Sequence, residues 1–359
     1  MTDHAPELLV REDVSGVQPL HGYMARTCPM KVALDAAPPE GVVRRAPTPA
    51  RLARREAGLV FEGEIFDLLV AAHPDAVDLR GVTDRGDTVA KTVAALQAGA
   101  PMVLAGWLPD DTGQHRSGRP DVLLRGRQRG DGRWGYLPVD VKSHKTLAAP
   151  SSTTCPGYLS SLDDIATHPA DLAEAVDEPA RWTGKIADDL VQLAHYWRML
   201  QAHGLHDDSG GAWAGVIGSE QVCTWYRLDE EGPLRPSWRT VTGRWTNLEA
   251  YDHEFGFRLD ILARVQDGRD PGVVPAYNLR WCDECEWWPH CESQMVAADE
   301  VTLLPRIDWN RRMRLHAARP DHAYPDRGAG PRGGGAGRPR RAGPGDRCWR
   351  CRRAGRGDR

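Results

Sequence analysis

The chain has 359 residues, of which 41% are hydrophobic and 27% charged, so its apolar content is sufficient for a folded core. No apolar run reaches the roughly 18 to 20 residues of a membrane span, which argues against an integral membrane protein. The formal net charge is −4, and because the stretch from Pro320 to the C-terminus is rich in arginine, the rest of the chain is distinctly acidic. Bulk positive charge therefore does not hold this protein on DNA, and any contact with DNA must be local.

Two terminal segments differ in composition from the sequence between them. Residues 1–20 look like a loose leader, and residues 319–359 are dominated by Gly, Arg and Pro with almost no aliphatic side chains. A segment that cannot bury apolar surface remains disordered, so we expect one folded domain over residues 21–318. The tail has two further interpretations, an Arg/Gly arm that binds nucleic acid and a frameshifted or truncated end.

The first predicted helix covers residues 56–70, where apolar side chains recur at helical spacing after a proline-rich loop. Glu62 lies in this helix and is a candidate ligand for a metal ion. The alternative is an ordinary glutamate that faces solvent, and periodicity alone favours this alternative.

Next along the chain, residues 121–125 and 134–142 predict two strands, joined by the turn signal Gly130-Asp131-Gly132-Arg133. Antiparallel pairing returns Asp140 close to Asp121, and alternation along the strand places Asp140 and Lys142 on one face. Two carboxylates suit Mg²⁺ or Mn²⁺, which can activate a bound water against a phosphodiester, with Lys142 orienting the water or neutralising the phosphate. The alternative is a solvated hairpin with a weak ion pair. Nearby arginines could bind phosphates, namely Arg119, Arg125, Arg127 and Arg129.

Residues 145–181 predict a long connection with a short helix near residues 170–176. Residues 188–200 then predict an amphipathic helix, acidic at its start and basic near its end. Gln192 and Tyr196 stand one turn apart on this helix and could hold a phosphate or a base. The alternative is that Tyr196 only borders the core.

The cysteines are the second strong signal. Cys282, Cys285 and Cys291 lie close together in a tryptophan-rich segment, and Cys28 is the best candidate for a fourth partner. Four thiolates suit an iron-sulfur cluster or structural Zn²⁺, and His290 leaves a Cys/His zinc site open. Disulfides are not expected in a cytoplasmic protein, and no signal peptide is evident. The isolated Cys155 and Cys223 are interpreted as incidental or buried thiols.

Taken together, these motifs resemble the RecB/AddB-type nucleases of the PD-(D/E)XK superfamily, most closely the branch with an iron-sulfur cluster. In that branch one N-terminal and three C-terminal cysteines bracket the nuclease core, as Cys28 and the three downstream cysteines do here. By motif, Asp121 and Asp140 resemble the metal-binding acids, Lys142 the catalytic lysine, and Gln192 with Tyr196 the Gln-x3-Tyr element. The resemblance covers about residues 20–316. Many relatives have histidine where Glu62 falls, so Glu62 departs from the pattern.

The resemblance implies an α/β fold, with a restriction-endonuclease-like mixed sheet flanked by helices and terminal segments joined by a Cys-ligated 4Fe-4S cluster or Zn²⁺. It also implies a Mg²⁺- or Mn²⁺-dependent DNA exonuclease that prefers single strands or ends and acts in DNA repair, recombination or defence. A helicase is one candidate protein partner, and because the chain has no helicase motif, ATP-driven unwinding by the chain itself is not expected. The alternative is a catalytically inactive DNA-binding module that keeps the fold and the cluster.

Overall fold

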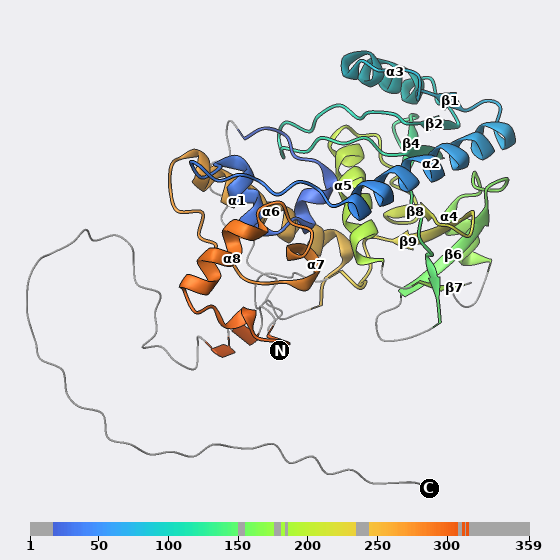
Figure 1. The fold of residues 1–359 in the computed structure, drawn as a ribbon. Coiled ribbons are helices and arrows are strands. Elements are labelled where there is room, and N and C mark those ends of the chain that lie inside the picture. The colour runs from blue at the N-terminus through green and yellow to red at the C-terminus, as the bar shows by residue number, and fades with distance from the viewer. Residues whose placement is uncertain are drawn as a thin grey trace, which may run out of the picture. The chain divides into compact units, whose positions relative to one another are not determined.

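The computed structural model describes residues 17–149, 155–175, 181–183, 186–234, 244–307, 311–312 and 314–315. The chain divides into two compact units, and every described element belongs to the first, residues 1–315 (Figure 1). The predictions for the tail at 319–359, and for all but the end of the leader at 1–20, lie outside the described residues. No helix among the described residues has both the length and the apolar character needed to cross a membrane.

A mixed β-sheet forms the centre of this unit. Seven strands follow one another in the order β1-β2-β3-β4-β8-β9-β6, and two short strands, β7 and β5, extend the sheet beyond β6. The β1-β2 and β4-β8 pairs are parallel and the other pairs antiparallel. The strands are β1 (Val77–Asp78), β2 (Met102–Leu104), β3 (Val122–Gln128), β4 (Trp134–Val141), β5 (Leu147–Ala148), β6 (Cys155–Ser161), β7 (Arg181–Thr183), β8 (Trp213–Ile217) and β9 (Val222–Arg227).

The predicted hairpin is confirmed as β3 and β4. Val122 pairs with Val139, so Asp121, which directly precedes β3, stands opposite Asp140. The register shifts between Arg125 and Gln128, and β3 runs three residues beyond its predicted end. The acids come together because pairing is in register at this end of the hairpin, away from the irregularity.

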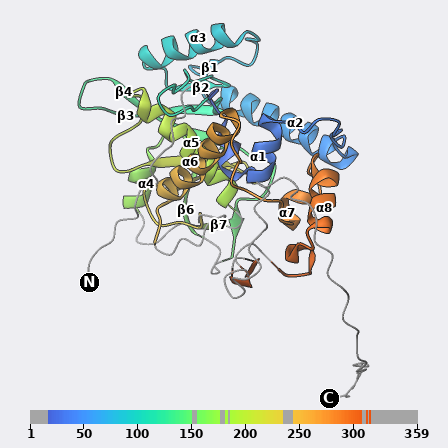
Figure 2. The ribbon, with the colours of Figure 1, turned by 90° about the vertical axis from the view of Figure 1, so that its left-hand side faces the viewer.

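Helices cover both faces of the sheet, which confirms the predicted fold class at the level of a mixed α/β sheet flanked by helices. Side chains of α2 (Pro49–Ala72) and α4 (Pro169–Glu174) pack on the face that carries Val139 and Val141. The opposite face is covered by α5 (Ala187–Ala202), and α6 (Asn247–Gln266) packs against α5 (Figure 2). The helix α3 (Arg85–Gln97) packs with β2, β3 and the C-terminal half of α5.

The predicted helix at 56–70 is longer than expected. It begins at Pro49, because the hydroxyl of Thr48 accepts a hydrogen bond from the backbone N–H of Arg51 and caps the first turn. The helices at 170–176 and 188–200 are confirmed as α4 and α5. However, α5 lies between the sheet and α6 and is therefore buried on nearly all sides. The amphipathic pattern predicts one solvent-exposed face, which this packing covers.

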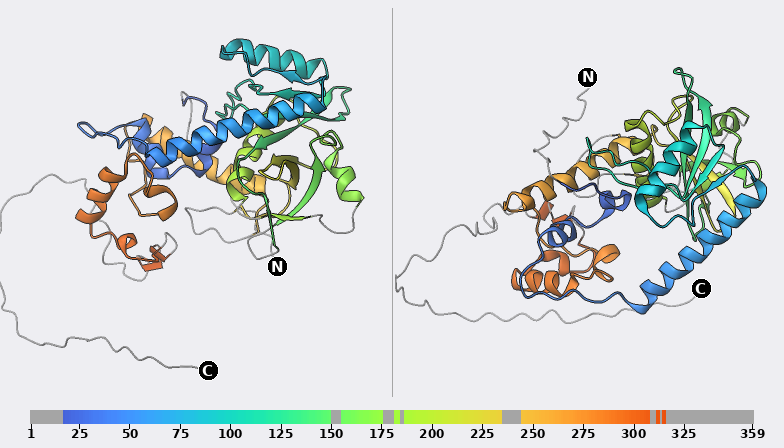
Figure 3. Two further views of the ribbon diagram at one scale, coloured as in Figure 1. Left: turned by 45° about the vertical axis from the view of Figure 1, so that its right-hand side comes forward. Right: turned by 90° about the horizontal axis from the view of Figure 1, so that it is seen from above.

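The N-terminal and C-terminal elements of the described chain pack together. Near the N-terminus are η1 (Gly22–Arg26) and α1 (Pro29–Ala36), and near the C-terminus α7 (Leu279–Cys282), α8 (Trp288–Ala297) and η2 (Val301–Leu303). The indole N–H of Trp287 donates to Asp35 over 2.7 Å, and Lys31 forms an ion pair with Glu286. Figure 3 shows α1 beside α7 and α8. The first and last described segments, which are far apart in the sequence, therefore lie side by side in the folded unit.

Candidate active site and cysteine cavity

The two hairpin carboxylates form the centre of the candidate active site. Asp121 accepts a hydrogen bond from the backbone N–H of Val141 over 2.7 Å. Asp140 is fully buried, its carboxylate forms an ion pair with the ammonium of Lys142, and no backbone N–H of the described residues donates to it. Burial, together with the charge of Asp140, raises the pKa of Asp121 well above its usual value. Both acids can be ionised together only if positive charge offsets their repulsion, and a divalent ion would add to the single charge of Lys142.

Lys142 is held by three side chains. Besides its ion pair with Asp140, its ammonium donates to Gln192 Oε1 over 3.0 Å and to the hydroxyl of Tyr23 over 3.1 Å. Burial opposes the lysine charge, but Asp140, Tyr23 and the other neighbours outweigh this effect and raise its pKa well above the usual value. Lys142 is therefore a fixed, charged group beside the acids.

Gln192 and Tyr196, one turn apart on α5, are hydrogen-bonded to each other beside Lys142. The side-chain amide of Gln192 donates to the hydroxyl of Tyr196 over 2.8 Å, so the phenol fixes the amide that in turn accepts from Lys142. Tyr196 is also packed in the core beside Met199 and Leu200. Tyr196 is therefore part of the core, and its role in holding a phosphate or a base stays a prediction.

Glu62 approaches the acids from α2 and is not a plain solvent-facing residue. Burial raises the pKa of its carboxyl, Asp140 adds to this increase, and Arg119 and Lys142 oppose it. These interactions place Glu62 within electrostatic range of the hairpin carboxylates. Within the described ranges, however, no group of three or more His, Cys, Asp or Glu side chains is arranged to hold a metal ion.

The acid pair alone fits a magnesium-type ion. Mg²⁺ commonly keeps several waters and is bound through one or two carboxylates, so Asp121 and Asp140 form a sufficient protein donor set. The observation that favours this fit is the carboxylate of Asp140, which is buried opposite a second carboxylate and accepts no backbone hydrogen bond from the described residues.

Two site residues are missed by the sequence interpretation. Tyr23 adjoins the loose leader, and no local signal marks it. Asp189 is interpreted only as an acid in the first turn of a helix, yet it is buried on the site side of α5, three residues before Gln192. Burial raises its pKa to about 7, and Asp140 adds to this increase while Lys142 opposes it. The i, i+3 spacing from Gln192 is the signal that could have identified it.

Most of the predicted phosphate-binding arginines already have protein partners. Arg125 donates to Gly99 O over 2.7 Å and lies over the ring of Trp134. Arg127 forms an ion pair with Asp171, and Arg129 donates to His206 O over 2.5 Å. Arg119, which is exposed and acts electrostatically on Glu62, is the better candidate for a phosphate contact.

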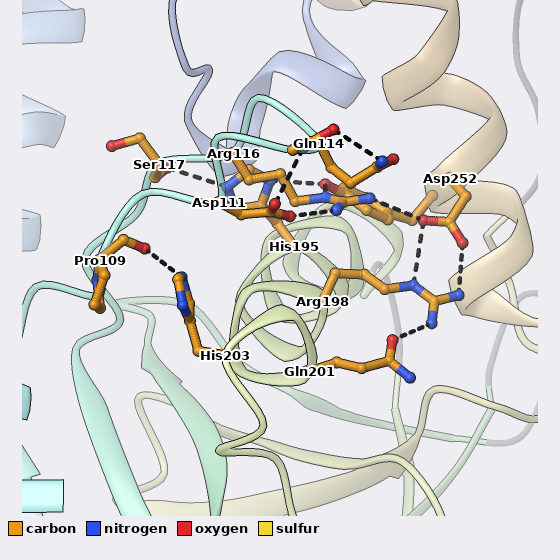
Figure 4. A network of polar contacts seen from close by, with 12 residues as sticks. Pro109, Asp111, Gln114, Arg116, Ser117, His195, Arg198, Gln201, His203 and Asp252 are labelled. Carbon is orange, nitrogen blue, oxygen red and sulfur yellow. Dashed lines mark hydrogen bonds and ion pairs between the residues drawn. The ribbon is translucent and has the colours of Figure 1, made fainter. Parts of the chain in front are cut away.

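A buried polar network fixes the loop that leads to Asp121. Arg116 forms an ion pair with Asp111 at 2.8 Å and donates to the hydroxyl of Tyr251 over 3.1 Å. His195 Nδ1 lies 2.8 Å from the same hydroxyl, and its Nε2 lies 3.1 Å from Ser117 O (Figure 4). Burial lowers the pKa of His195 to about 3, so the imidazole is neutral.

The same loop is seated closely on α5. A Cβ added to Gly118 would lie 2.6 Å from Cε1 of Tyr196, so glycine is needed there to let the backbone approach the ring. The loop and α5 together therefore hold Asp121 near Gln192 and Tyr196.

Replacing Arg116 with methionine is expected to lower the free energy of unfolding by about 3 to 5 kcal/mol, because it leaves Asp111 charged and buried without its partner. Urea denaturation of the two proteins measures this difference. Arg133→Met is the matched control, since Arg133 pairs with Asp131 at the exposed hairpin turn and its loss should leave the transition unchanged. Equal effects of the two substitutions would contradict the proposed role of the network.

The four predicted cysteines lie near one another at a second location, although among the described residues they are not arranged as a metal site. Cys28, Cys282, Cys285 and Cys291 line one small cavity, whose other walls include Lys31 and the rings of Trp281, Trp287 and Trp288. All four are free thiols. Burial raises the pKa of Cys28, and raises the pKa of Cys282 and Cys291 to about 12, with the neighbouring thiols adding to each increase. A metal centre would supply the positive charge that four thiolates need in this cavity.

The predictions for His290 and for the isolated Cys223 and Cys155 have different outcomes. The cavity-lining residues do not include His290, whose Nε2 lies 2.9 Å from Gln294, so a Cys/His zinc site is disfavoured. Cys223 is buried in the core among apolar side chains, as expected for an incidental thiol. The side chain of Cys155 lies outside the described residues.

Comparison with protein-family models gave no match, and neither did comparison with curated proteins. The function is therefore inferred from the residues of this chain.

Proposed function

We propose that this protein is a Mg²⁺- or Mn²⁺-dependent deoxyribonuclease of the RecB-like type, which hydrolyses phosphodiester bonds in single-stranded DNA or at DNA ends. One observation carries the proposal: the buried Asp140 carboxylate stands opposite Asp121, forms an ion pair with the ammonium of Lys142 and accepts no backbone hydrogen bond from the described residues. Strongly perturbed carboxyl groups close to a specific charged partner are concentrated at functional sites, which supports a catalytic role for this pair.

Each side chain has a defined part in the proposed hydrolysis. Asp121 and Asp140 would hold the divalent ion, which supplies a water of lowered pKa and polarises a phosphate oxygen. Lys142 would donate to a nonbridging phosphate oxygen as negative charge builds there. Gln192 keeps the ammonium directed at the site, and Tyr196 keeps Gln192 in place.

We also propose that the four cysteines hold a 4Fe-4S cluster, with Zn²⁺ as the alternative metal. Their convergence on one cavity from both ends of the folded unit supports this proposal, because thiolates close together need a positive charge between them. The bound group would cross-link the N-terminal and C-terminal segments.

The test of the nuclease is cleavage of end-labelled single-stranded DNA with Mn²⁺, compared with EDTA and with the Lys142→Ala variant. We expect metal-dependent loss of label that falls strongly in the variant. DNA binding without cleavage by the wild type would instead support the inactive binding module. Metal-independent cleavage, equal in both proteins, would refute the assignment.

Replacing Asp189 with asparagine is expected to stabilise the metal-free protein at pH 8 more than at pH 5. The folded-state pKa of Asp189, about 7, exceeds the usual value, so its contribution to stability is present below about pH 4 and is lost as pH rises through 7. Asparagine stays neutral, and the pH-dependent gain should be on the order of 3 kcal/mol.

Urea denaturation in EDTA at the two pH values measures this gain. His144 Nε2 lies 3.2 Å from Asp189 Oδ2, so both proteins carry His144→Gln to remove this imidazole, and Glu62 and Asp121 are common to both. A gain that is the same at pH 5 and pH 8 would show that the Asp189 carboxyl does not titrate in this window.

A further inference from the structure

Tyr23 comes from the N-terminal edge of the described chain, yet its hydroxyl lies in the candidate active site. Lys142 Nζ donates to this hydroxyl over 3.1 Å and lies 5.6 Å from the centre of the ring. Because Lys142 is itself held by Asp140 and Gln192, the contact fixes the direction of the tyrosine ring.

The ring of Tyr23 is open to solvent. Its exposed fraction is 46%, whereas Tyr196, the other tyrosine beside Gln192, is 5% exposed and packed in the core. A half-exposed aromatic ring that is tied by its hydroxyl to a catalytic lysine combines a fixed orientation with an accessible face. Of these two tyrosines, Tyr23 is therefore the one able to contact a substrate.

The segment that carries Tyr23 is anchored on both sides. Arg26 forms an ion pair with Asp188 at 2.8 Å, and the buried Arg258 donates to Thr27 O over 3.0 Å. A Cβ added to Gly22 would lie 3.3 Å from Cγ of Gln192, so this residue is seated closely on α5. The ring therefore forms a preorganised platform, which reduces the entropy lost when a ligand binds.

We propose that Tyr23 determines substrate specificity by stacking on an unpaired base next to the scissile phosphate. This inference rests on the proposed nuclease function, which puts that phosphate at Asp121, Asp140 and Lys142. In a duplex the faces of each base are covered by neighbouring base pairs, whereas an unpaired base has a face free for an aromatic ring. Stacking also suits an acidic protein that lacks bulk positive charge for DNA binding.

The test compares Tyr23→Leu with Tyr23→Phe on single-stranded DNA and on a blunt duplex of the same sequence, with Mn²⁺. Tyr23→Leu should raise KM for the single strand about tenfold, in the range for loss of one base-aromatic stack, and change KM for the duplex less than about twofold. Tyr23→Phe keeps the ring and should keep KM, while the loss of the Lys142 contact lowers kcat. Trp134→Leu removes a partly exposed ring at the other end of β4 and should leave KM for both substrates unchanged.

Equal increases of KM for the two DNA forms, or identical KM values for the leucine and phenylalanine variants, would overturn the proposal. A separate binding measurement distinguishes its failure from failure of the nuclease. Fluorescence of 2-aminopurine in a short single strand, measured with Ca²⁺, should be quenched by the wild type and by Tyr23→Phe but not by Tyr23→Leu. Quenching by the wild type with Ca²⁺, combined with no cleavage in the separate Mn²⁺ assay, would refute the nuclease and retain the stacking contact. Unchanged quenching in Tyr23→Leu would refute the stacking contact.

Discussion

Asp140→Asn is expected to lower the rate of Mn²⁺-dependent cleavage of single-stranded DNA about 10³-fold. Asparagine has nearly the shape of aspartate but carries no negative charge, so the hairpin retains one anionic ligand, Asp121, for the metal. A loss of this size corresponds to about 4 kcal/mol of transition-state stabilisation, which is reasonable for a ligand to a catalytic ion. Single-turnover cleavage of end-labelled DNA measures the loss.

A matched control is Asp75→Asn, which makes the same change of charge at an exposed turn after α2. It should cleave at the wild-type rate. Thermal denaturation adds a readout besides activity: Mn²⁺ should raise the melting temperature of the wild type and of Asp75→Asn, but not of Asp140→Asn. If Asp140→Asn retained both its cleavage rate and its response to Mn²⁺, Asp140 would not be a metal ligand.

The parts of the site that depend on local sequence could be predicted. The hairpin was identifiable because its turn signal and strand alternation fix the register that brings Asp121 opposite Asp140. Gln192 and Tyr196 share a helix, so their relation follows from helical spacing. The grouping of Cys28 with the C-terminal cysteines was inferred from their chemistry, and the structure places all four around one cavity.

The parts that depend on tertiary packing could not be predicted in the same way. Tyr23 reaches Lys142 only because η1 packs on α5, and no pattern near residue 23 reveals this contact. The charges of Arg125, Arg127 and Arg129 suggested phosphate binding, but the sequence does not show that their partners include Asp171 and His206. The helix α3 was not anticipated, although Asp84 caps it by accepting from the N–H of Asp87.

Replacing Cys285 with serine should both remove the metal centre and destabilise the protein strongly. Cys28 and Cys282 are far apart in sequence, so in the loop-entropy model a cluster joining them contributes roughly 5 kcal/mol by restricting the unfolded chain. For a domain of this size the loss corresponds to a fall in melting temperature of roughly 10 °C. Cys223→Ala removes a buried thiol elsewhere and should keep the metal content of the wild type.

The colour of an anaerobic preparation distinguishes the two metals. A brown protein with absorption near roughly 400 nm that disappears in Cys285→Ser would support the iron-sulfur cluster. A colourless wild type with stoichiometric zinc would assign Zn²⁺ and leave the stability argument unchanged, because either group cross-links the same segments. If the wild type held neither metal and Cys285→Ser melted at the same temperature, the cavity would contain thiols only.

Because Cys28 directly follows the segment that carries Tyr23, loss of the metal centre should also weaken the contact between Tyr23 and Lys142 and lower the cleavage rate.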